Sequence, residues 1–346
     1  MDVQAVGHSL IRPGQILIER GTVSAVSRWT QAIAEADGVC VVRLSPGVDP
    51  CELVAELRDQ GHRASPNHVF AGQPLFFGGP ASRPFPADPV KAKIGRERSG
   101  VTVALLDTGV AAHPWWAGST WYGGLPEAAA DAVQGAQAGH GTFIAGLLLR
   151  QAPESSLRVA RVLDGDGLGD EAGVVRALRR LRQREQEGAR PGDLAGGPHV
   201  LNLSFGGHTH NDQPSPLLAD AVSALTETVV VACAGNTGSD RPFWPAALPG
   251  VIGVGALDAA EERRAPFSAH GSWIDAWARG EWLTSAYLRT GEFAGYASWS
   301  GTSFAAALVS GAIARAAADL PPHEAAQAVL KERQIPDLGA VVPATR

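Results

Sequence analysis

Short apolar runs alternate with segments of helical periodicity from about residue 100 onward. The apolar runs are rich in valine and cover residues 101–106, 157–163, 200–205, 229–234 and 251–256. The helical segments cover residues 142–150, 171–184, 216–225, 302–320 and 322–334. Continuous apolar runs are typical of parallel strands covered on both faces, so the pattern predicts an α/β fold with a mainly parallel sheet.

The first 90 residues follow a different pattern, with shorter elements and more frequent turns. Strands are predicted over residues 15–19, 39–44 and 65–70, and helices over residues 26–36 and from Asp49-Pro50 to about Gln60. The second helix is the better marked, because proline suits a first helical turn and Leu53, Val54 and Leu57 recur at helical spacing. These elements together predict a small α+β unit.

Proline and glycine are concentrated between residues 70 and 100, which marks a linker with little regular structure. The chain therefore divides into a small α+β domain over residues 1–72, a Pro/Gly-rich linker over residues 73–99 and a main domain over residues 100–346. If the protein cleaves itself, the cut is expected between residues 70 and 100.

Charge and cysteine content narrow the function classes. The 346-residue chain has a net charge of -6 and no basic run, which argues against a nucleic-acid surface. Cys40, Cys51 and Cys233 form no close pairs, so neither a disulfide framework nor a zinc site is predicted. Asp164 and Asp166 alone do not supply the converging oxygen ligands of a calcium site. We expect a monomer with no cofactor and no essential metal.

Three short motifs carry the candidate chemistry: Asp107-Thr108-Gly109, Gly139-His140-Gly141-Thr142 and Gly301-Thr302-Ser303. Their order, Asp, His, Ser, is one of the known chain orders of hydrolytic triads. A serine hydroxyl needs a base within hydrogen-bond reach and a third group that orients this base. We expect Asp107 to orient His140, and His140 to take the proton of Ser303 and pass it to the leaving amine.

Other protein classes fit these residues less well. An α/β-hydrolase would place serine first and histidine last in the chain, and the Ser303 segment lacks the second glycine of its nucleophile elbow. A dinucleotide-binding fingerprint at Gly253 and Gly255 has Asp258 at its third glycine position. A catalytically silent binding or scaffold protein stays open as an alternative. Within the enzyme class, broad protein turnover and dedicated trimming of one precursor both stay open.

The three motifs resemble those of the subtilase family of serine proteases, and the resemblance covers about residues 100–320. It implies a subtilisin-like three-layer α/β fold and a serine endopeptidase that hydrolyses peptide bonds through an acyl-enzyme intermediate. Residues 65–69 are similar to the end of subtilase propeptides. The resemblance therefore implies that residues 1–72 form a propeptide-like domain, a possible intramolecular inhibitor. A permanently attached structural domain is the alternative.

The resemblance also assigns roles around the serine. The segment 232–236 is similar to the subtilase motif of the oxyanion-hole asparagine, so Asn236 and the backbone N–H of Ser303 are expected to stabilise negative charge on the attacked carbonyl oxygen. Extended substrate is expected to pair with two segments, and four further residues are expected to form a wall of the primary specificity pocket. The two segments are Gly167, Leu168, Gly169 and Ser204, Phe205, Gly206, and the wall residues are Ala232, Cys233, Ala234 and Gly235. Cys233 is expected to be an inert wall residue.

The chain departs from the family pattern at several positions. Ala307 and Leu308 stand where proline and histidine are usual, and Arg279 replaces a common proline. The chain also lacks the loop that carries a tight calcium site in many secreted relatives. Residues 1–20 have no charged start followed by an apolar core, and no segment approaches the ~20 apolar residues that span a bilayer. A cytoplasmic enzyme with no membrane or nucleic-acid partner is predicted.

Overall fold

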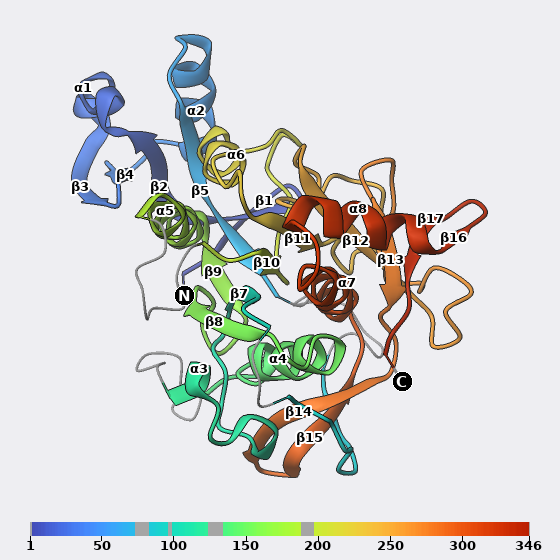
Figure 1. The fold of residues 1–346 in the computed structure, drawn as a ribbon. Helices are drawn as coiled ribbons and strands as arrows, with labels where there is room; N and C mark the ends of the chain where they lie inside the picture. The colour runs from blue at the N-terminus through green and yellow to red at the C-terminus, as the bar shows by residue number, and fades with distance from the viewer. Residues whose placement is uncertain (1, 73–82, 96–98, 124–133, 188–196, 346) are drawn as a thin grey trace.

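The computed structural model describes residues 2–72, 83–95, 99–123, 134–187 and 197–345. Within these residues, the largest sheet has eight strands in the order β16-β17-β13-β12-β11-β10-β7-β8 (Figure 1). Its strands are β7 (Thr102–Asp107), β8 (Ser156–Arg161), β10 (Val200–Leu203), β11 (Val229–Cys233), β12 (Val251–Leu257), β13 (Ala276–Arg279), β16 (Gln334–Ile335) and β17 (Gly339–Val342). All neighbours pair in parallel except β16 and β17, which confirms the predicted mainly parallel sheet.

Helices cover both faces of this sheet and produce three layers (Figure 1). Side chains alternate between the two faces of a strand. On β7, Val103 and Leu105 pack into one core and Ala104 and Leu106 into another. The first core includes α4 (His140–Gln151), α7 (Thr302–Ala316) and α8 (Pro322–Glu332), and the second includes α5 (Glu171–Glu187) and α6 (Pro216–Ser223). The predicted three-layer α/β architecture is confirmed.

The N-terminal residues form a second sheet with one helix packed on it. Its strands run in the order β3-β4-β2-β5-β9, and β1 pairs with β2. They are β1 (Gln4–Val6), β2 (Ser9–Glu19), β3 (Thr30–Ala36), β4 (Val39–Leu44), β5 (Ala64–Ala71) and β9 (Leu168–Asp170). The helix α2 (Pro50–Asp59) begins at Asp49, whose carboxylate accepts hydrogen bonds from the N–H groups of Cys51 and Glu52. Ile16, Val42 and Val54 lie in the core between this helix and the sheet.

The helix predicted over residues 26–36 is wrong. The structure has short helical turns in α1 (Val23–Val26) and η2 (Ser27–Trp29), followed by β3. Alanine and glutamate in this segment favour a helix locally. Pairing with β4 overrides that preference, because an edge strand is stabilised by its neighbour and not by its own residues alone.

The remaining elements extend the main domain and the linker. They are β6 (Phe85–Pro86), η3 (Pro114–Trp116), α3 (Thr120–Gly123), β14 (Leu283–Thr290) and β15 (Phe293–Trp299), while η1 (Arg20–Thr22) lies before α1 in the N-terminal unit. Within the predicted linker, residues 73–82 and 96–98 lie outside the described residues. The described part contributes β6, which pairs antiparallel with β15.

Strand β5 connects the two halves of the molecule. It pairs with β2 on one side and with β9 of the main domain on the other. The opposite face of the N-terminal sheet places Leu17 and Val39 in the same buried cluster as Val174 and Leu178 of α5. The N-terminal unit therefore shares a core with the main domain and is not tethered by the linker alone.

Candidate active site

A buried carboxylate and an imidazole meet at the end of β7. Asp107 is the last residue of this strand, and His140 is the first residue of α4. His140 Nδ1 donates to Asp107, at 2.9 Å from Oδ1 and 3.0 Å from Oδ2. Both side chains are fully buried, and Asp107 Oδ1 also accepts the N–H of Thr108 at 2.8 Å. A carboxylate can only accept here, so Nδ1 carries the proton and Nε2 is the basic nitrogen.

The start of α4 is held against β7 by short contacts. The Gly141 N–H donates to Thr108 Oγ1 at 3.1 Å, and a Cβ at position 141 would lie 2.3 Å from the carbonyl oxygen of Gly109. Only glycine permits this approach. The rings of Trp299 and Phe304 each lie 5.6 Å from the His140 ring and fix its plane. The imidazole therefore has one orientation, which Asp107 and these rings set together.

Ser303 lies in the first turn of α7, as predicted. Its hydroxyl lies within hydrogen-bond distance of two carbonyl oxygens, those of Gly72 at 2.9 Å and Ser204 at 3.0 Å, which share its one proton. A Cβ at Gly72 would lie 3.2 Å from His140 Cε1, so the Gly72 backbone, whose carbonyl oxygen accepts from Ser303, runs beside the imidazole. Nε2 of His140 is buried and has no hydrogen-bond partner among the described residues.

Asn236 follows β11 and is fixed through its amide oxygen. Thr302 donates to Asn236 Oδ1 from its backbone nitrogen at 2.8 Å and from its hydroxyl at 3.0 Å. These two donors require that the atom they contact is the oxygen, so the amide nitrogen is the donor end of the side chain. Asn236 is only 4% exposed and is tied to the residue that precedes Ser303.

The two segments expected to pair with substrate flank an extended strand, and that strand is β5. On one side Phe70 pairs with Gly169 and Ala71 with Leu168, and the Gly72 N–H donates to Gly167 O at 2.9 Å. On the other side Ala71 and Gly206 exchange hydrogen bonds of 2.9 and 3.1 Å. The chain itself thus adds a strand to the cleft in the manner of an extended peptide.

The Phe70 side chain fills the apolar part of this cleft. It is 1% exposed and stacks on Phe205, with ring centroids 6.3 Å apart. Leu106, Leu163 and Phe205 of the main domain belong to the same buried cluster. Ser204 acts through its side chain as well, because its hydroxyl donates to the carbonyl oxygen of Ser303 at 2.8 Å and accepts from Asn202 Nδ2 at 2.8 Å. This buried chain of hydrogen bonds fixes α7 against β10.

A cavity of about 450 Å³ lies beside the strand end. Of the predicted wall residues, Cys233 and Gly235 line it, together with Asn236 and Phe243. Ala232 instead packs in the core beneath α5 and α6. Ala234 is fully buried, and its N–H donates to the Val254 carbonyl oxygen of β12. Residues 7–10, in the turn between β1 and β2 and at the start of β2, also line the cavity, so the N-terminal unit forms part of its wall.

Cys233 has the environment expected of an inert wall residue. Burial raises the pKa of its thiol to about 12, and nearby hydroxyl groups of Ser303 and Thr302 oppose this shift only in part. Thiolate is the reactive form of cysteine, so the thiol is unreactive near neutral pH. The other two cysteines are also free, with Cys40 buried and Cys51 partly buried.

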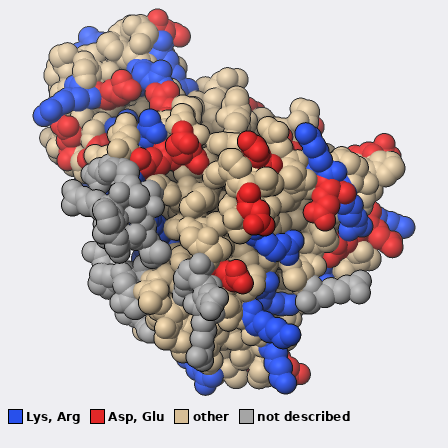
Figure 2. Space-filling view, in the orientation of Figure 1, with Lys and Arg blue, Asp and Glu red and all other residues tan. Residues whose placement is uncertain are grey.

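Surface charge is mixed on the face seen in Figure 2. Basic and acidic side chains are interspersed there, with uncharged surface between them. A nucleic-acid backbone is bound by a continuous basic surface, and this face offers none.

Three parts of the site were not predicted in the roles described above. They are Gly72, the Ser204 hydroxyl and the β1–β2 turn. A glycine two positions before a proline in a Pro/Gly-rich stretch carries no distinguishing signal. Ser204 was predicted for its backbone, and the partner of its hydroxyl lies 99 residues away. The similarity of residues 65–69 to a propeptide end was the one available signal for the occupied cleft.

Comparison with known proteins finds a protease family and several of its members that are similar to this chain. The profile of the Subtilase family matches residues 98–337. Subtilisin BL of Lederbergia lenta is 33% identical over 234 residues, which span 64% of this chain and 77% of the relative. Thermitase of Thermoactinomyces vulgaris is 33% identical over 228 residues, which span 62% and 74%. Subtilisin Savinase of Lederbergia lenta is 33% identical over 234 residues, which span 64% and 77%.

These relatives correct the prediction of a cytoplasmic enzyme. That prediction is wrong, because the matching proteins are subtilisins, a thermitase and alkaline proteases, which are kinds of subtilase that are secreted. Among the described residues, no helix has both the length and the apolar character required to cross a membrane.

Proposed function

The chain belongs to the subtilase family and is a subtilisin-like serine endopeptidase, and we propose that Asp107, His140 and Ser303 are its catalytic residues. The observation that carries this proposal is the buried Asp107–His140 hydrogen bond, together with the Gly72 backbone, which accepts from the Ser303 hydroxyl and runs beside the His140 ring. His140 presents its basic nitrogen in an apolar surrounding, where no other described group competes for it.

The reaction proceeds by proton transfer through His140. As Ser303 Oγ attacks the carbonyl carbon of a bound peptide, its proton moves to His140 Nε2 and the carbonyl π pair moves to the oxygen. Collapse of the tetrahedral intermediate breaks the C–N bond, and the amine leaves with the proton from Nε2. Water then attacks the acyl-enzyme carbonyl and gives a proton to His140 Nε2. Collapse of the second tetrahedral intermediate breaks the ester C–O bond, Nε2 returns the proton to Ser303 Oγ, and the acid is released. Asp107 stabilises the imidazolium in both steps.

Asn236 is proposed to stabilise the negative charge that develops on the attacked oxygen. The hydrogen bonds from Thr302 hold its amide oxygen, so its nitrogen is oriented before substrate binds. The backbone N–H of Ser303, at the N-terminus of α7, is the second donor. An oriented donor of this kind contributes about 3 kcal/mol to transition-state stabilisation.

Residues 1–72 are proposed to be an inhibitory domain, followed by a linker over residues 73–99. Support comes from β5, which lies in the cleft with backbone hydrogen bonds on both sides. The Ser303 hydroxyl donates to the Gly72 carbonyl oxygen. A carbonyl poised for attack would direct its oxygen at the oxyanion donors and its carbon at the hydroxyl. The observed contact therefore supports a blocked state in which substrate is excluded.

A serine-reactive phosphonate tests the assignment of the nucleophile. Because β5 is proposed to block the cleft, the chain is first treated with an added protease that cuts away residues 1–72. We then expect one adduct, located at Ser303 by peptide mass analysis, in the wild-type chain and in Ser310→Ala. Ser310 is a matched control, because its buried hydroxyl lies two turns along the same helix and bonds Asn202. Ser303→Ala should give no adduct.

Two outcomes would contradict the proposal. Labelling that persists in Ser303→Ala would place the nucleophile elsewhere. An unlabelled wild-type chain, even after an added protease has cut away residues 1–72, would favour a catalytically silent protein.

A further inference from the structure

Three arginines form a row along α5 that the proposed reaction does not use. Arg176, Arg180 and Arg184 are spaced four residues apart, so their side chains lie on one face of the helix over about 12 Å. Like charges at this spacing destabilise a helix, although the chain as a whole carries a net charge of -6. A basic row of this kind is stabilised by a negatively charged partner.

The row borders a groove of about 580 Å³ between α5 and β8. Arg158 and Arg161 contribute further positive charge from the β8 side. The remaining described residues of the lining are glycine or apolar, among them Ala160, Val162 and Leu181, and none is acidic. The groove therefore has an apolar floor between two basic walls, which fits a ligand with both carboxylates and apolar side chains.

The charge of the row is only partly compensated by the described residues around it. Among these residues, one ion pair involves the row, that of Arg180 Nε with Asp37 Oδ2 at 3.3 Å, and the Arg180 side chain is 61% exposed. An exposed pair contributes little to stability, so a ligand can displace it. Arg176 Nε donates to the neutral Ala172 carbonyl oxygen at 3.0 Å, and Arg184 is exposed. The row therefore keeps a surplus of positive charge.

The groove begins beside the cleft. Strand β9, which pairs with β5 in the cleft, leads directly into α5. A Cβ at Gly169 of β9 would lie 2.3 Å from the carbonyl oxygen of Val162, which lines the groove. A substrate that takes the place of β5 therefore passes close to the groove.

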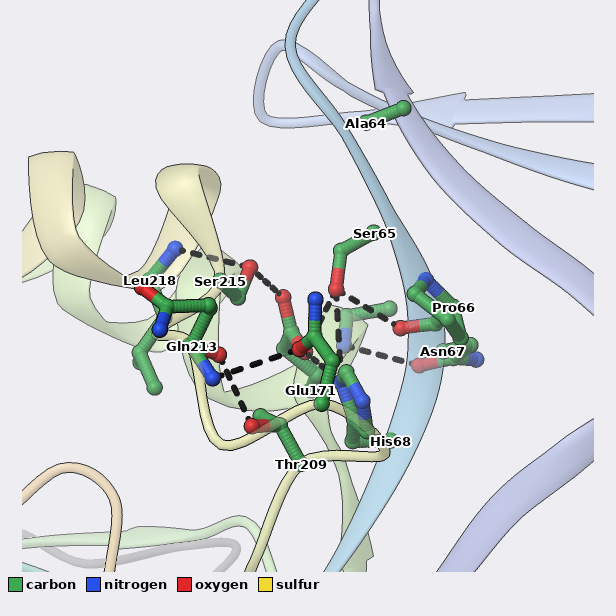
Figure 3. Close-up of polar contacts among 12 residues, drawn as sticks. Ala64, Ser65, Pro66, Asn67, His68, Glu171, Thr209, Gln213, Ser215 and Leu218 are labelled. Atoms are coloured by element: carbon green, nitrogen blue, oxygen red, sulfur yellow. Dashed lines mark hydrogen bonds and ion pairs between the residues drawn. The ribbon is translucent and has the colours of Figure 1, made fainter. Parts of the chain in front are cut away.

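The start of α5 is fixed relative to the cleft by buried polar contacts (Figure 3). Glu171, the first residue of α5, is fully buried. It accepts hydrogen bonds from the hydroxyl of Ser65 in β5, at 3.2 Å, and from the hydroxyl of Ser215, which caps α6. The helix therefore presents the arginine row at a fixed position next to the cleft.

The spacing of the row matches an extended peptide. Arginines four residues apart on a helix are about 6 Å apart along its axis, and alternate side chains on an extended strand are about 6.6 Å apart. Acidic residues at every second position of a peptide can thus meet successive arginines, while the side chains between them face the opposite wall. A nucleic acid needs a longer basic surface, and the net charge of -6 opposes its approach.

We propose that the groove between α5 and β8 binds an acidic segment of protein substrates, in which acidic and apolar residues alternate. This inference rests on the proposed function, because the bound protein is then cut at Ser303. It names the substrate class, which is proteins that carry such a segment outside the stretch that enters the cleft.

Fluorescence anisotropy tests the groove in the full chain carrying Ser303→Ala, which leaves the probe uncut. The probe is a labelled peptide in which glutamate alternates with valine. Because β5 lies in the cleft of this chain, the probe reports on binding outside the cleft. Replacement of every glutamate by glutamine should weaken binding by at least about tenfold, since charge-assisted hydrogen bonds to the arginines are lost. Added salt should weaken binding of the glutamate peptide as well.

Two arginine variants assign the binding to the groove. Arg184→Gln removes one positive charge from the row and should weaken binding of the glutamate peptide by about tenfold. Arg182→Gln is the matched control, because Arg182 lies on the same helix, pairs with Glu185 at 3.0 Å and does not line the groove. It should bind the peptide as tightly as the chain without this change.

Kinetics test the link to substrate choice, in the chain with Ser303 present and residues 1–72 cut away by an added protease. A substrate that carries the alternating acidic segment should have a KM about tenfold lower than the same substrate without the segment. Equal KM values would overturn the role of the groove in substrate selection.

The failures of the groove and of the triad can be told apart. Equal affinity for the two peptides, or an equal loss in Arg182→Gln and Arg184→Gln, would overturn the groove as a binding site and leave the triad intact. Displacement of the peptide by an equimolar single-stranded DNA would overturn the choice of an acidic peptide. Peptide binding without hydrolysis of either substrate would overturn the proposed triad and leave the binding site.

Discussion

At the scale of single residues, Thr302 connects the proposed nucleophile to the proposed oxyanion donor. Its backbone nitrogen and hydroxyl both donate to Asn236, and its hydroxyl accepts from the Gly235 N–H at 3.1 Å. Because Thr302 precedes Ser303 directly, the amide donor and the reacting hydroxyl are held by one short stretch of chain. Both groups are therefore placed before substrate arrives, which is the condition for electrostatic stabilisation.

Replacement of Asn236 by alanine should lower kcat by about 100- to 1000-fold, because the donor acts only on charge that develops in the transition state. KM for a peptide substrate should change little, since ground-state binding depends on the backbone of the cleft. Steady-state kinetics of the variant and wild type in the same processed form measure this. Asn211→Ala, at an exposed amide, serves as the control. An unchanged kcat would remove Asn236 from the mechanism.

The residues of the proposed triad could be located in the sequence because each stands in its own short motif. Asp107, His140 and Ser303 carry neighbours that are specific to their task, such as the glycine after His140 that permits close approach to β7. Gly72 and the hydroxyl of Ser204 could not be predicted, because their roles are defined by partners more than 90 residues away. Local sequence does not encode such contacts.

At the scale of elements, the segment between β7 and α4 contains a buried histidine. His113 precedes η3, and its Nε2 lies 3.1 Å from the carbonyl oxygen of Gly295, which makes it the donor. Its ring packs against Trp115, Trp116 and Tyr296. Burial lowers the pKa of His113 to about 4, and the Gly295 hydrogen bond opposes this shift only partly. The segment is therefore built for a neutral imidazole.

Acid should destabilise the fold through this residue. In the unfolded chain a histidine titrates near 6.5, so below that pH the unfolded state binds more protons and stability falls as the pH decreases toward 4. The loss between pH 7 and 4.5 should be about 2 kcal/mol of unfolding free energy. In His113→Gln, which retains a donor for Gly295, the loss should shrink by that amount. Urea unfolding of the Ser303→Ala chain at both pH values measures this.

The control for this effect is His62→Gln, which should lose as much stability in acid as the unmodified chain. An acid loss in His113→Gln equal to that of the unmodified chain would show that His113 titrates normally in the fold.

Elements with internal periodicity could be predicted, and edge elements could not. The predicted strand over residues 39–44 coincides with β4, and α2 begins at Pro50 as predicted. Strand β3 was predicted as a helix, because its residues are exposed and carry no alternation of buried and exposed positions. Its structure is determined by the β4 edge beside it.

At the scale of the whole molecule, apolar packing and strand pairing attach the N-terminal unit. Ion pairs at its margin include Arg180–Asp37 at 3.3 Å, with Arg180 largely exposed, and such exposed pairs contribute about 0–1 kcal/mol each. Leu17, Val39 and Phe70 instead share a fully buried cluster with α5. The boundary at residue 72 that the sequence predicts divides the chain into two segments. The buried core does not stop there, because residues from both segments pack into it.

The central claim is that a competent catalytic site is held closed by the chain's own strand β5, with Phe70 as its main apolar anchor. Phenylalanine-to-alanine changes at buried sites lower stability by about 3–5 kcal/mol. At Phe70 this loss destabilises the state in which β5 lies in the cleft. The most direct measurement is the rate at which full-length protein hydrolyses a short peptide, compared between wild type and Phe70→Ala. Ile33→Ala, at an exposed position of the same N-terminal sheet, is the control. The account predicts a large gain in rate for Phe70→Ala and none for Ile33→Ala. Equal rates for Phe70→Ala and wild type, with the variant folded, would contradict it.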